Sequence, residues 1–326
     1  MPQTLMMLMA GLFEHGLLHE RIANYMTTYV FCGQGSQRPG MGHALFDKFA
    51  EYVCCADEIL GYSIKDLCLN DREHVLDNTQ YTQPALFVVS MLEFYERQES
   101  HTSPDFYIGH SIGEYAALCA AEAFSFVEGL RIVKERGRLM GMIKAGGMAA
   151  IIGISSDEVH EILNMNALES IDIANYNSFD QTVISGPAQD IIDARAFFID
   201  SGARAYLPLK VSGAFHSRYM LDVQQLLGKF IQPMQFCELT VPVISNYTAR
   251  EYEKGKTKNT LLPQISQAVR WVDSIRYLMS YTDMKFVPIG PGNTTSKLVK
   301  SILKAKAPFF DSDSNRSSVP TINYDD

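Results

Sequence analysis

The pentapeptide Gly-His-Ser-Ile-Gly at residues 109–113 most constrains what this chain can fold into. It follows the apolar run 106–108 and precedes the helix-forming run 114–118. A strand, a sharp turn and a helix in this order form a nucleophile elbow, whose glycines let the backbone turn tightly and expose a serine hydroxyl. The pentapeptide alone also occurs in plain turns, and its context favours the elbow. The sequence therefore predicts Ser111 as a nucleophile and the backbone amide of Ile112 as a donor to developing negative charge.

Strand-like and helical runs alternate along most of the chain, which predicts an α/β fold with a parallel sheet. A different order, β-α-β-β-α-β, is expected over residues 146–210 and predicts a ferredoxin-like small subdomain. This segment interrupts a large α/β-hydrolase-like subdomain, which comprises residues 27–145 and 211–306. Residues 1–26 are expected to form a poorly ordered N-terminal extension, and the polar residues 311–326 a disordered tail.

Two element boundaries follow from turn residues. The first core strand is expected at 27–31, from where the chain runs into the glycine-rich turn 33–37. Pro84 is expected to open a helix that continues to Phe94, because proline is favoured at the first helical position.

Charge and cysteine usage narrow the partners and the compartment. Lys and Arg number 28 and Asp and Glu number 37, so the formal net charge is 28 minus 37, or −9. This balance argues against nucleic acid or an anionic membrane as a general partner. The six cysteines lie at irregular spacings that suggest neither a disulfide framework nor a zinc site. A cytoplasmic protein without a metal centre is therefore expected.

A serine nucleophile needs a base, and His216 is a candidate. On the residues alone, a histidine beside Phe215 is more often a packed core residue than a catalytic one. His110 adjoins Ser111 and cannot easily turn back onto it, so we expect this imidazole to help order the site. Arg136 lies in the run 130–140 among other charged residues, which by itself indicates a solvated helix face.

Several motifs occur in the order found in malonyl-CoA:acyl carrier protein transacylases, and the chain resembles this family over about residues 27–304. It looks most like the discrete, trans-acting acyltransferases that serve modular polyketide synthases. The motifs are Gly33-Gln34-Gly35-Ser36-Gln37, Thr82-Gln83-Pro84-Ala85-Leu86, the pentapeptide with Glu114-Tyr115, Arg136-Gly137, Ala214-Phe215-His216-Ser217, Pro242-Val243-Ile244-Ser245-Asn246 and Gly290-Pro291-Gly292.

The resemblance assigns roles to several of these residues. It implies a Ser-His dyad in which His216 is the base, oriented by a backbone carbonyl near Gln264 and not by a third carboxylate. On the residues alone, the Gln264 side chain would be expected in solvent. The second oxyanion-hole amide is implied to come from Gln34, where a plain turn is the alternative. Arg136 is implied to bind the free carboxylate of a malonyl group, since a guanidinium holds a carboxylate in a bidentate pair.

The residues of two further segments bear on substrate preference within the family. Phe215, in the Ala-Phe-His-Ser sequence, accompanies malonyl over methylmalonyl, because the ring fills the space that an α-methyl group would need. Asn175 and Asn177 resemble a loop that lines the cleft, although Phe179 stands where the family usually has proline.

The resemblance thus implies a ping-pong malonyl transfer through a serine ester. Malonyl-CoA is the substrate, no cofactor is tightly bound, and the acceptor is the phosphopantetheine thiol of a holo acyl carrier protein. Service in trans to a polyketide synthase is expected. The alternatives are a malonyltransferase of fatty acid synthesis, a proofreading hydrolase of acyl carrier proteins, and an inactive docking subunit, against which the presence of both Ser111 and His216 argues.

Overall fold

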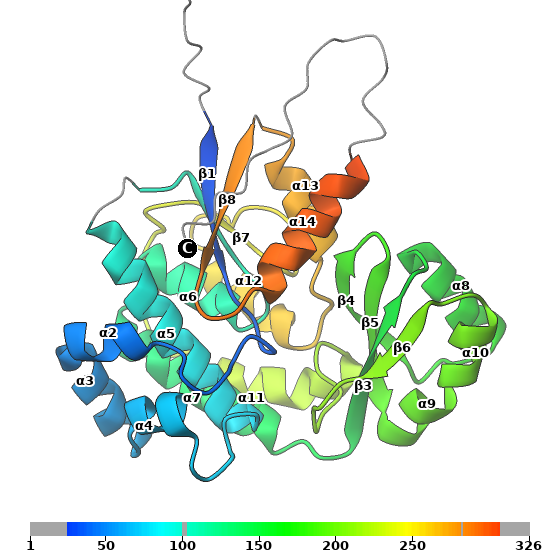
Figure 1. Cartoon of the computed structure of the whole chain (residues 1–326), viewed down its shortest axis with the longest axis horizontal. Coiled ribbons are helices and arrows are strands. Elements are labelled where there is room, and N and C mark those ends of the chain that lie inside the picture. The colour runs from blue at the N-terminus through cyan, green and yellow to red at the C-terminus, as the bar shows by residue number, and fades with distance from the viewer. Residues whose placement is uncertain (1–24, 100–102, 282, 307–326) are drawn as a thin grey trace, which may run out of the picture.

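A computed structural model describes residues 25–99, 103–281 and 283–306 (Figure 1). The predicted tail at 311–326 lies outside the described residues, as does the predicted extension up to residue 24. None of the helices in the described ranges is long and apolar enough to cross a membrane. Two four-stranded sheets organise the chain.

The first sheet is parallel and has the strand order β7-β2-β1-β8. Its strands are β1 (Met26–Phe31), β2 (Phe106–Gly109), β7 (Val243–Ile244) and β8 (Met284–Ile289). The α/β class with a parallel sheet is therefore confirmed. β1 begins at Met26, one residue before the predicted 27–31, and Met26 pairs with Met284 at the start of β8.

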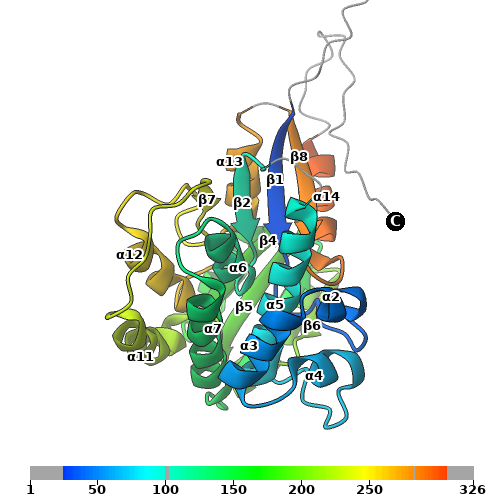
Figure 2. The ribbon, with the colours of Figure 1, turned by 90° about the vertical axis from the view of Figure 1, so that its left-hand side faces the viewer.

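Helices cover both faces of the parallel sheet, and the alternation of side chains along β1 explains why. Tyr29 and Phe31 pack into the core beneath α5 (Thr79–Gln98) and α6 (Gly113–Ala120). Val30 points the other way, into a core built with α13 (Trp271–Leu278) and α14 (Thr294–Lys306). Figure 1 shows α13 and α14 on one side of the strands, and Figure 2 shows the helices of the other layer in front of them.

Pro84 does not open its helix, so that prediction is wrong. α5 begins at Thr79, where the side chain of Asn78 accepts a hydrogen bond from the backbone N–H of Gln80 at 3.2 Å. Asparagine is a preferred N-cap residue, and this cap fixes the helix start five residues before the proline. The ring is accommodated inside the helix, where it costs one intrahelical hydrogen bond. α5 packs against α7 (Phe126–Gly141), which starts at a capping box of Ser125 and Glu128.

The remaining helices of this part of the chain lie around the same core. They are α2 (His43–Lys48), α3 (Ala50–Leu60), α4 (Ile64–Asn70), η1 (Arg218–Met220), α11 (Leu221–Ile231), α12 (Thr257–Leu261) and η2 (Leu262–Ile265).

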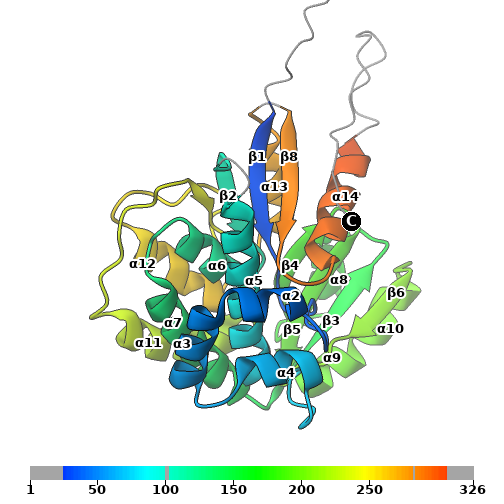
Figure 3. The ribbon, with the colours of Figure 1, turned by 60° about the vertical axis from the view of Figure 1, so that its left-hand side comes forward.

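The second sheet is antiparallel and has the strand order β4-β5-β3-β6 (Figure 3). Side chains alternate along β3: Ala149 and Ile151 pack beneath the helices, whereas Met148 and Ala150 face the large core and line a cavity. This sheet therefore serves as one wall of that cavity. In chain order its elements are β3 (Gly146–Ile152), α8 (Ser156–Met165), β4 (Asp172–Ser178), β5 (Gln181–Pro187), α9 (Ala188–Asp193), α10 (Arg195–Asp200) and β6 (Ala205–Pro208).

Candidate active site

The site lies at the carboxyl ends of the parallel strands. Gln34 follows β1, Ser111 follows β2 and Asn246 follows β7. Because the strands run in the same direction, these three residues meet at one edge of the sheet, which is where open α/β sheets bind their ligands. The antiparallel sheet lies beyond this edge (Figure 1).

Ser111 occupies a sharp turn between β2 and α6. Its backbone has a φ of 52°, in the left-handed region that non-glycine residues rarely adopt. A Cβ atom at Gly109 would lie 2.0 Å from the backbone of Gly113, and one at Gly113 would lie 2.5 Å from the carbonyl oxygen of Cys32. Only glycine fits both positions, so the backbone forms the tight elbow that the sequence pattern predicts.

His216 lies directly against the serine. Ser111 Oγ is 2.7 Å from His216 Nε2, and His216 Nδ1 is 2.7 Å from the carbonyl oxygen of Gln264. Because a carbonyl can only accept, Nδ1 carries the proton and Nε2 is free to accept one from the serine. Burial, followed by the charge of Arg136, lowers the pKa of His216 to about 3, so the imidazole is neutral near pH 7. This is the protonation state that a base requires.

The Gln264 side chain is fully buried, so the expectation of a solvated glutamine is wrong. Its Nε2 donates to the carbonyl oxygen of Ser111 at 2.6 Å and to Glu114 Oε2 at 2.8 Å, and its Oε1 accepts from Arg136 Nη2 at 3.1 Å. Both its backbone and its side chain therefore contact the groups around the serine. Sequence alone missed this because η2 is a short 3-10 turn with no apolar periodicity.

Arg136 is fully buried as well, so the solvated helix face that its neighbours indicate is wrong. Its Nη2 donates to Ser111 Oγ at 3.2 Å, and its guanidinium stacks 5.1 Å above the ring of Tyr115. Burial lowers the pKa of Arg136, yet arginine stays protonated in proteins. Among the described residues no carboxylate pairs with this cation, and its Nε and Nη1 have no hydrogen-bond partner. The guanidinium is therefore a buried positive charge next to Ser111 Oγ.

The turn after β1 approaches the elbow closely. A Cβ atom at Gly33 would lie 2.8 Å from the carbonyl oxygen of His110, so glycine is required there. The next residue, Gln34, lines the same cavity as Ser111, and its side chain donates to Thr79 Oγ1 at 3.2 Å. Within the described part of the chain, the backbone amides of Gln34 and Ile112 donate to no protein group. Both are free for a ligand.

A cavity of about 410 Å³ opens onto Ser111 and His216. His110 is half-buried and lines this cavity, its Nε2 lies 2.9 Å from Asn177 Oδ1, and the centroids of its ring and the Trp271 ring lie 5.1 Å apart in an edge-to-face arrangement. Burial lowers the pKa of His110, which favours a neutral structural imidazole. The lining side chains include Gln83, Met140, Met148, Asn175, Asn177, Val211 and Phe215.

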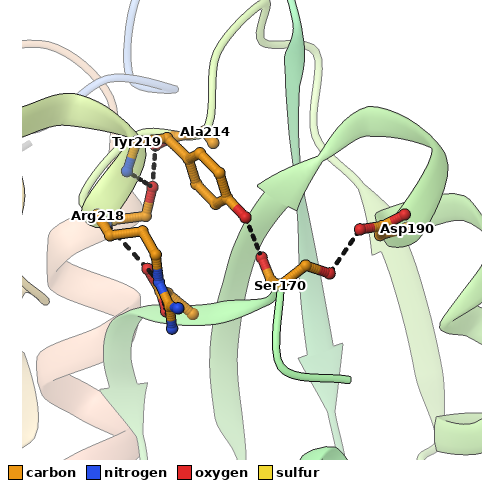
Figure 4. A network of polar contacts seen from close by, with 7 residues as sticks. Ser170, Asp190, Ala214, Arg218 and Tyr219 are labelled. Atoms are coloured by element: carbon orange, nitrogen blue, oxygen red, sulfur yellow. Dashed lines mark hydrogen bonds and ion pairs between the residues drawn. The ribbon is translucent and has the colours of Figure 1, made fainter. Parts of the chain in front are cut away.

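The segment after His216 is fastened to the antiparallel sheet (Figure 4). Arg218 forms an ion pair with Asp172 at the start of β4, in which Nε donates to Oδ1 at 2.9 Å and Oδ2 also accepts from the Arg218 backbone N–H at 2.8 Å. Tyr219 Oη donates to the carbonyl oxygen of Ser170 at 2.8 Å, and Ser170 Oγ donates to Asp190. These contacts link the base to the opposite wall of the cavity.

Three buried polar residues of the site carry no role in the sequence prediction. Asn246 accepts from the Ser111 backbone N–H at 2.7 Å and donates to the carbonyl oxygen of Gly109 at 2.7 Å. Glu114 lies beneath the elbow, and Gln83 lines the cavity with a buried, unpartnered Oε1. All three stand in the motifs that carry the family resemblance. Their signal is a polar side chain within an otherwise apolar run.

In the residues that the structure describes, no group of three or more His, Cys, Asp or Glu side chains could hold a metal ion. The chemistry of the site is that of a serine, a neutral imidazole, free backbone amides and a buried guanidinium. This set can form and break an acyl ester of Ser111.

Comparisons with known proteins agree with this geometry. The sequence model of the acyl transferase domain family matches residues 28–312 of this chain. The polyketide biosynthesis malonyl CoA-acyl carrier protein transacylase BaeC of Bacillus velezensis is 47% identical over 279 residues, which cover 85% of this chain and 96% of BaeC. The polyketide biosynthesis protein PksE of Bacillus subtilis is 48% identical over 285 residues, but the chain spans only 37% of its length.

Among solved structures, the malonyl CoA-acyl carrier protein transacylase of Burkholderia pseudomallei superimposes with a TM-score of 0.83 at 43% identity. The match covers 86% of this chain and 98% of that one. The family model covers most of the chain, and the parallel sheet and Ser111 elbow lie within it. The chain therefore belongs to the acyl transferase domain family.

Proposed function

We propose that this protein is a malonyl-CoA:acyl carrier protein acyltransferase that serves a polyketide synthase in trans. The observation that carries the proposal is the buried Arg136 guanidinium, which lies 3.2 Å from Ser111 Oγ and has no carboxylate partner among the described residues. A cation at this place selects an acyl group that ends in a carboxylate. The name of BaeC, which is 47% identical and is matched over 96% of its length, supports both the malonyl substrate and the polyketide pathway.

In the first half-reaction His216 Nε2 accepts the proton of Ser111 Oγ as the oxygen attacks the malonyl thioester carbonyl. The C–S bond breaks, the protonated imidazole returns its proton to the coenzyme A sulfur, and malonyl remains as a serine ester. In the second half-reaction the phosphopantetheine thiol of a carrier protein loses its proton to His216 and attacks the ester. The C–O bond breaks and Ser111 regains the proton, so the same pair works in both directions.

The negative charge of each tetrahedral intermediate falls on the former carbonyl oxygen. The backbone amides of Gln34 and Ile112 are the donors we assign to it, and both lack a protein acceptor. Amides held in place before the reaction stabilise this charge without reorganising. Ile112 also stands at the N-terminus of α6, where the helix dipole adds in the same sense.

The acyl pocket favours the small dicarboxylic group. Arg136 holds its carboxylate, and an acetyl group would leave the cation buried without a partner. Phe215 is buried and lines the cavity near Met140 and Met148, which restricts space for an α-methyl branch. Because one methyl group is worth only about 1 to 3 kcal/mol, discrimination against methylmalonyl is expected to be partial. Asn177 also lines the cavity, and its Oδ1 lies 2.9 Å from His110 Nε2.

We assign residues 27–145 and 211–306 to an α/β-hydrolase-like large subdomain and residues 146–210 to a ferredoxin-like small one. The strand order of the antiparallel sheet and its two helical crossovers support the second assignment. A cytoplasmic location suits both a coenzyme A thioester substrate and the six unpaired thiols.

The test follows one acyl group through both half-reactions. The protein is incubated with labelled malonyl-CoA, and malonyl-enzyme, malonyl-carrier and free malonate are measured with holo carrier proteins of polyketide and fatty acid synthesis. We expect rapid labelling of Ser111 and efficient transfer to polyketide carriers. Transfer confined to the fatty acid carrier would favour the fatty acid enzyme, and release of malonate faster than any transfer would favour a hydrolase. Ser111→Ala should abolish the labelled enzyme in every case.

A further inference from the structure

Glu114 is a buried carboxylate for which the transfer reaction described above has no use. It lies in the first turn of α6 and is fully inaccessible to solvent. Its Oε1 accepts from the backbone N–H of Asn246 at 3.1 Å and from the hydroxyl of Tyr252, and its Oε2 accepts from Gln264 Nε2 at 2.8 Å. A buried carboxylate is costly unless such donors satisfy it, so its presence at this point requires a reason.

Two partners of Glu114, Asn246 and Gln264, contact the reacting groups. The Asn246 side chain binds the Ser111 backbone N–H and the Gly109 carbonyl oxygen, on both sides of the elbow. The Gln264 side chain binds the Ser111 carbonyl oxygen and Arg136 Nη2, while its backbone carbonyl accepts from His216 Nδ1. A single intervening residue, Asn246 or Gln264, therefore connects Glu114 by hydrogen bonds to the nucleophile, the base and the guanidinium.

We propose that Glu114 is a positioning residue that fixes Gln264 and Asn246, and through them the relative placement of Ser111, His216 and Arg136. This inference rests on the proposed function, because it concerns the same dyad. Glu114 itself does not touch the acyl group. It acts by setting which way the amide of Gln264 faces.

The direction of the Gln264 amide matters because its two ends differ. With Nε2 on Glu114 and on the Ser111 carbonyl, Oε1 is left to accept from Arg136. The reversed amide would turn an N–H toward the Arg136 guanidinium, which can only donate. A carboxylate at 114 excludes the reversed amide because it accepts and never donates.

The charge of Glu114 contributes independently of its hydrogen bonds. Burial raises the pKa of Glu114 to about 7, while the hydrogen bonds that it accepts from Tyr252, Gln264 Nε2 and the Asn246 backbone N–H lower that pKa and favour the ionised carboxylate. Its negative charge raises the pKa of Arg136 and so offsets part of the cost of burying that cation. No ion pair joins the two in the described residues, so Arg136 keeps its free N–H groups for a substrate.

The decisive variant is Glu114→Gln, which keeps the shape and removes the charge. Its amide N–H would face a donor, so Gln264 must turn or move. We expect the single-turnover rate of Ser111 malonylation to fall on the order of 100-fold, because a displaced reacting pair loses rate steeply. We also expect the KM for malonyl-CoA to rise and the malonyl-over-acetyl ratio of kcat/KM to fall. A purely structural role would reduce both substrates equally. Glu114→Asp should restore part of the ratio.

Gln264→Met tests the same connection without touching Glu114. It removes the side-chain amide and leaves the carbonyl that orients His216, so its malonyl-over-acetyl ratio should also fall, and Glu114→Gln should add little to it. Glu161→Gln, an exposed change on α8, is the matched control and should keep the native rate. Melting temperatures establish that each variant is folded.

The outcomes separate the two proposals. Absence of malonylation in the native protein would overturn the proposed function. A native protein that is malonylated, together with a Glu114→Gln protein that is malonylated at the same rate and with the same selectivity, would overturn the role of Glu114. If Glu114→Gln does not fold, a native rate and ratio in Gln264→Met overturns it instead.

Discussion

Arg136 shows what a single buried charge can do at the residue scale. The guanidinium is removed from water, stacked on Tyr115 and left with two nitrogens, Nε and Nη1, that have no hydrogen-bond partner. Such a cation costs free energy in the free enzyme, and a substrate carboxylate recovers it. Under the proposed function, selectivity for a carboxylate comes from the unpaired guanidinium as well as from the shape of the cavity.

Arg136→Met should lower malonyl transfer far more than acetyl transfer. Loss of a buried charge-assisted pair costs about 2 to 5 kcal/mol for the carboxylate substrate and little for a neutral one. The measurement is kcat/KM for malonyl-CoA and acetyl-CoA with the same carrier protein. An equal loss for both substrates would contradict the proposed role, and Arg131→Met on an exposed position of the same helix is the control.

His216 predicts a dependence of stability on pH. Burial and the charge of Arg136 lower its pKa from 6.5 to about 3 in the folded protein, so the unfolded chain takes up a proton here in acid while the folded chain does not. The free energy of unfolding must therefore fall as the pH drops below 6.5, and no such term acts above that pH.

Replacing His216 with Gln should remove this contribution to the pH dependence of the free energy of unfolding. Between about pH 7 and pH 5 the melting temperature of His216→Gln should fall less than that of the native protein, measured by calorimetry in both. A native slope in His216→Gln would mean that its imidazole is accessible to protons in the folded state.

At the scale of elements, the elbow depends on two close approaches of backbone. Gly109→Ala would place a Cβ atom 2.0 Å from the carbonyl group of Gly113, where no side chain can move aside. We expect a loss of about 3 kcal/mol or more in the free energy of unfolding and no acyl-enzyme. Gly228→Ala in α11, where a Cβ meets only Leu262 side-chain atoms at 3.4 Å or more, should be neutral or slightly stabilising. Denaturant unfolding of both variants distinguishes these results.

The elements that sequence predicts well are those whose signal is local. The elbow at Ser111 and the parallel strand before it depend on glycines and apolar runs that are contiguous in the chain. The start of α5 shows where such reasoning fails, because Pro84 competes with the Asn78 cap and only one of the two signals sets the boundary. The sequence contains both signals, and the Asn78 cap is the stronger of the two.

The geometry around the serine shows the other limit. Gln264 stands 153 residues from Ser111, and its side chain is buried only because η2 packs beneath the elbow. Arg136 likewise reads as one charge among several until α7 is placed against α5. Family resemblance identified both positions, while burial and hydrogen bonds, which depend on distant segments, could not be read from the residues alone.

At the scale of the whole molecule, the cavity has walls from both sheets. His216 comes from the segment that leaves the antiparallel sheet, and the ion pair of Arg218 with Asp172 ties that segment back to β4 (Figure 4). The Arg218 side chain is 58% exposed, so its contribution to global stability should be small. The ion pair should instead determine how firmly one wall of the cavity is held against the other.

Asp172→Asn and Arg218→Gln should each raise the KM for malonyl-CoA several-fold while they change the melting temperature little. The double variant should resemble either single one, with a coupling energy of about 0.5 to 1 kcal/mol in a double-mutant cycle on kcat/KM. Because the pair is exposed, added salt should bring the native KM toward that of the variants. The matched control is Arg204→Gln, which breaks an exposed pair with Asp180 contained within the small sheet's own segments. Additive effects of the two single changes, or an equal rise of KM in Arg204→Gln, would show that the pair does not hold the cavity walls together.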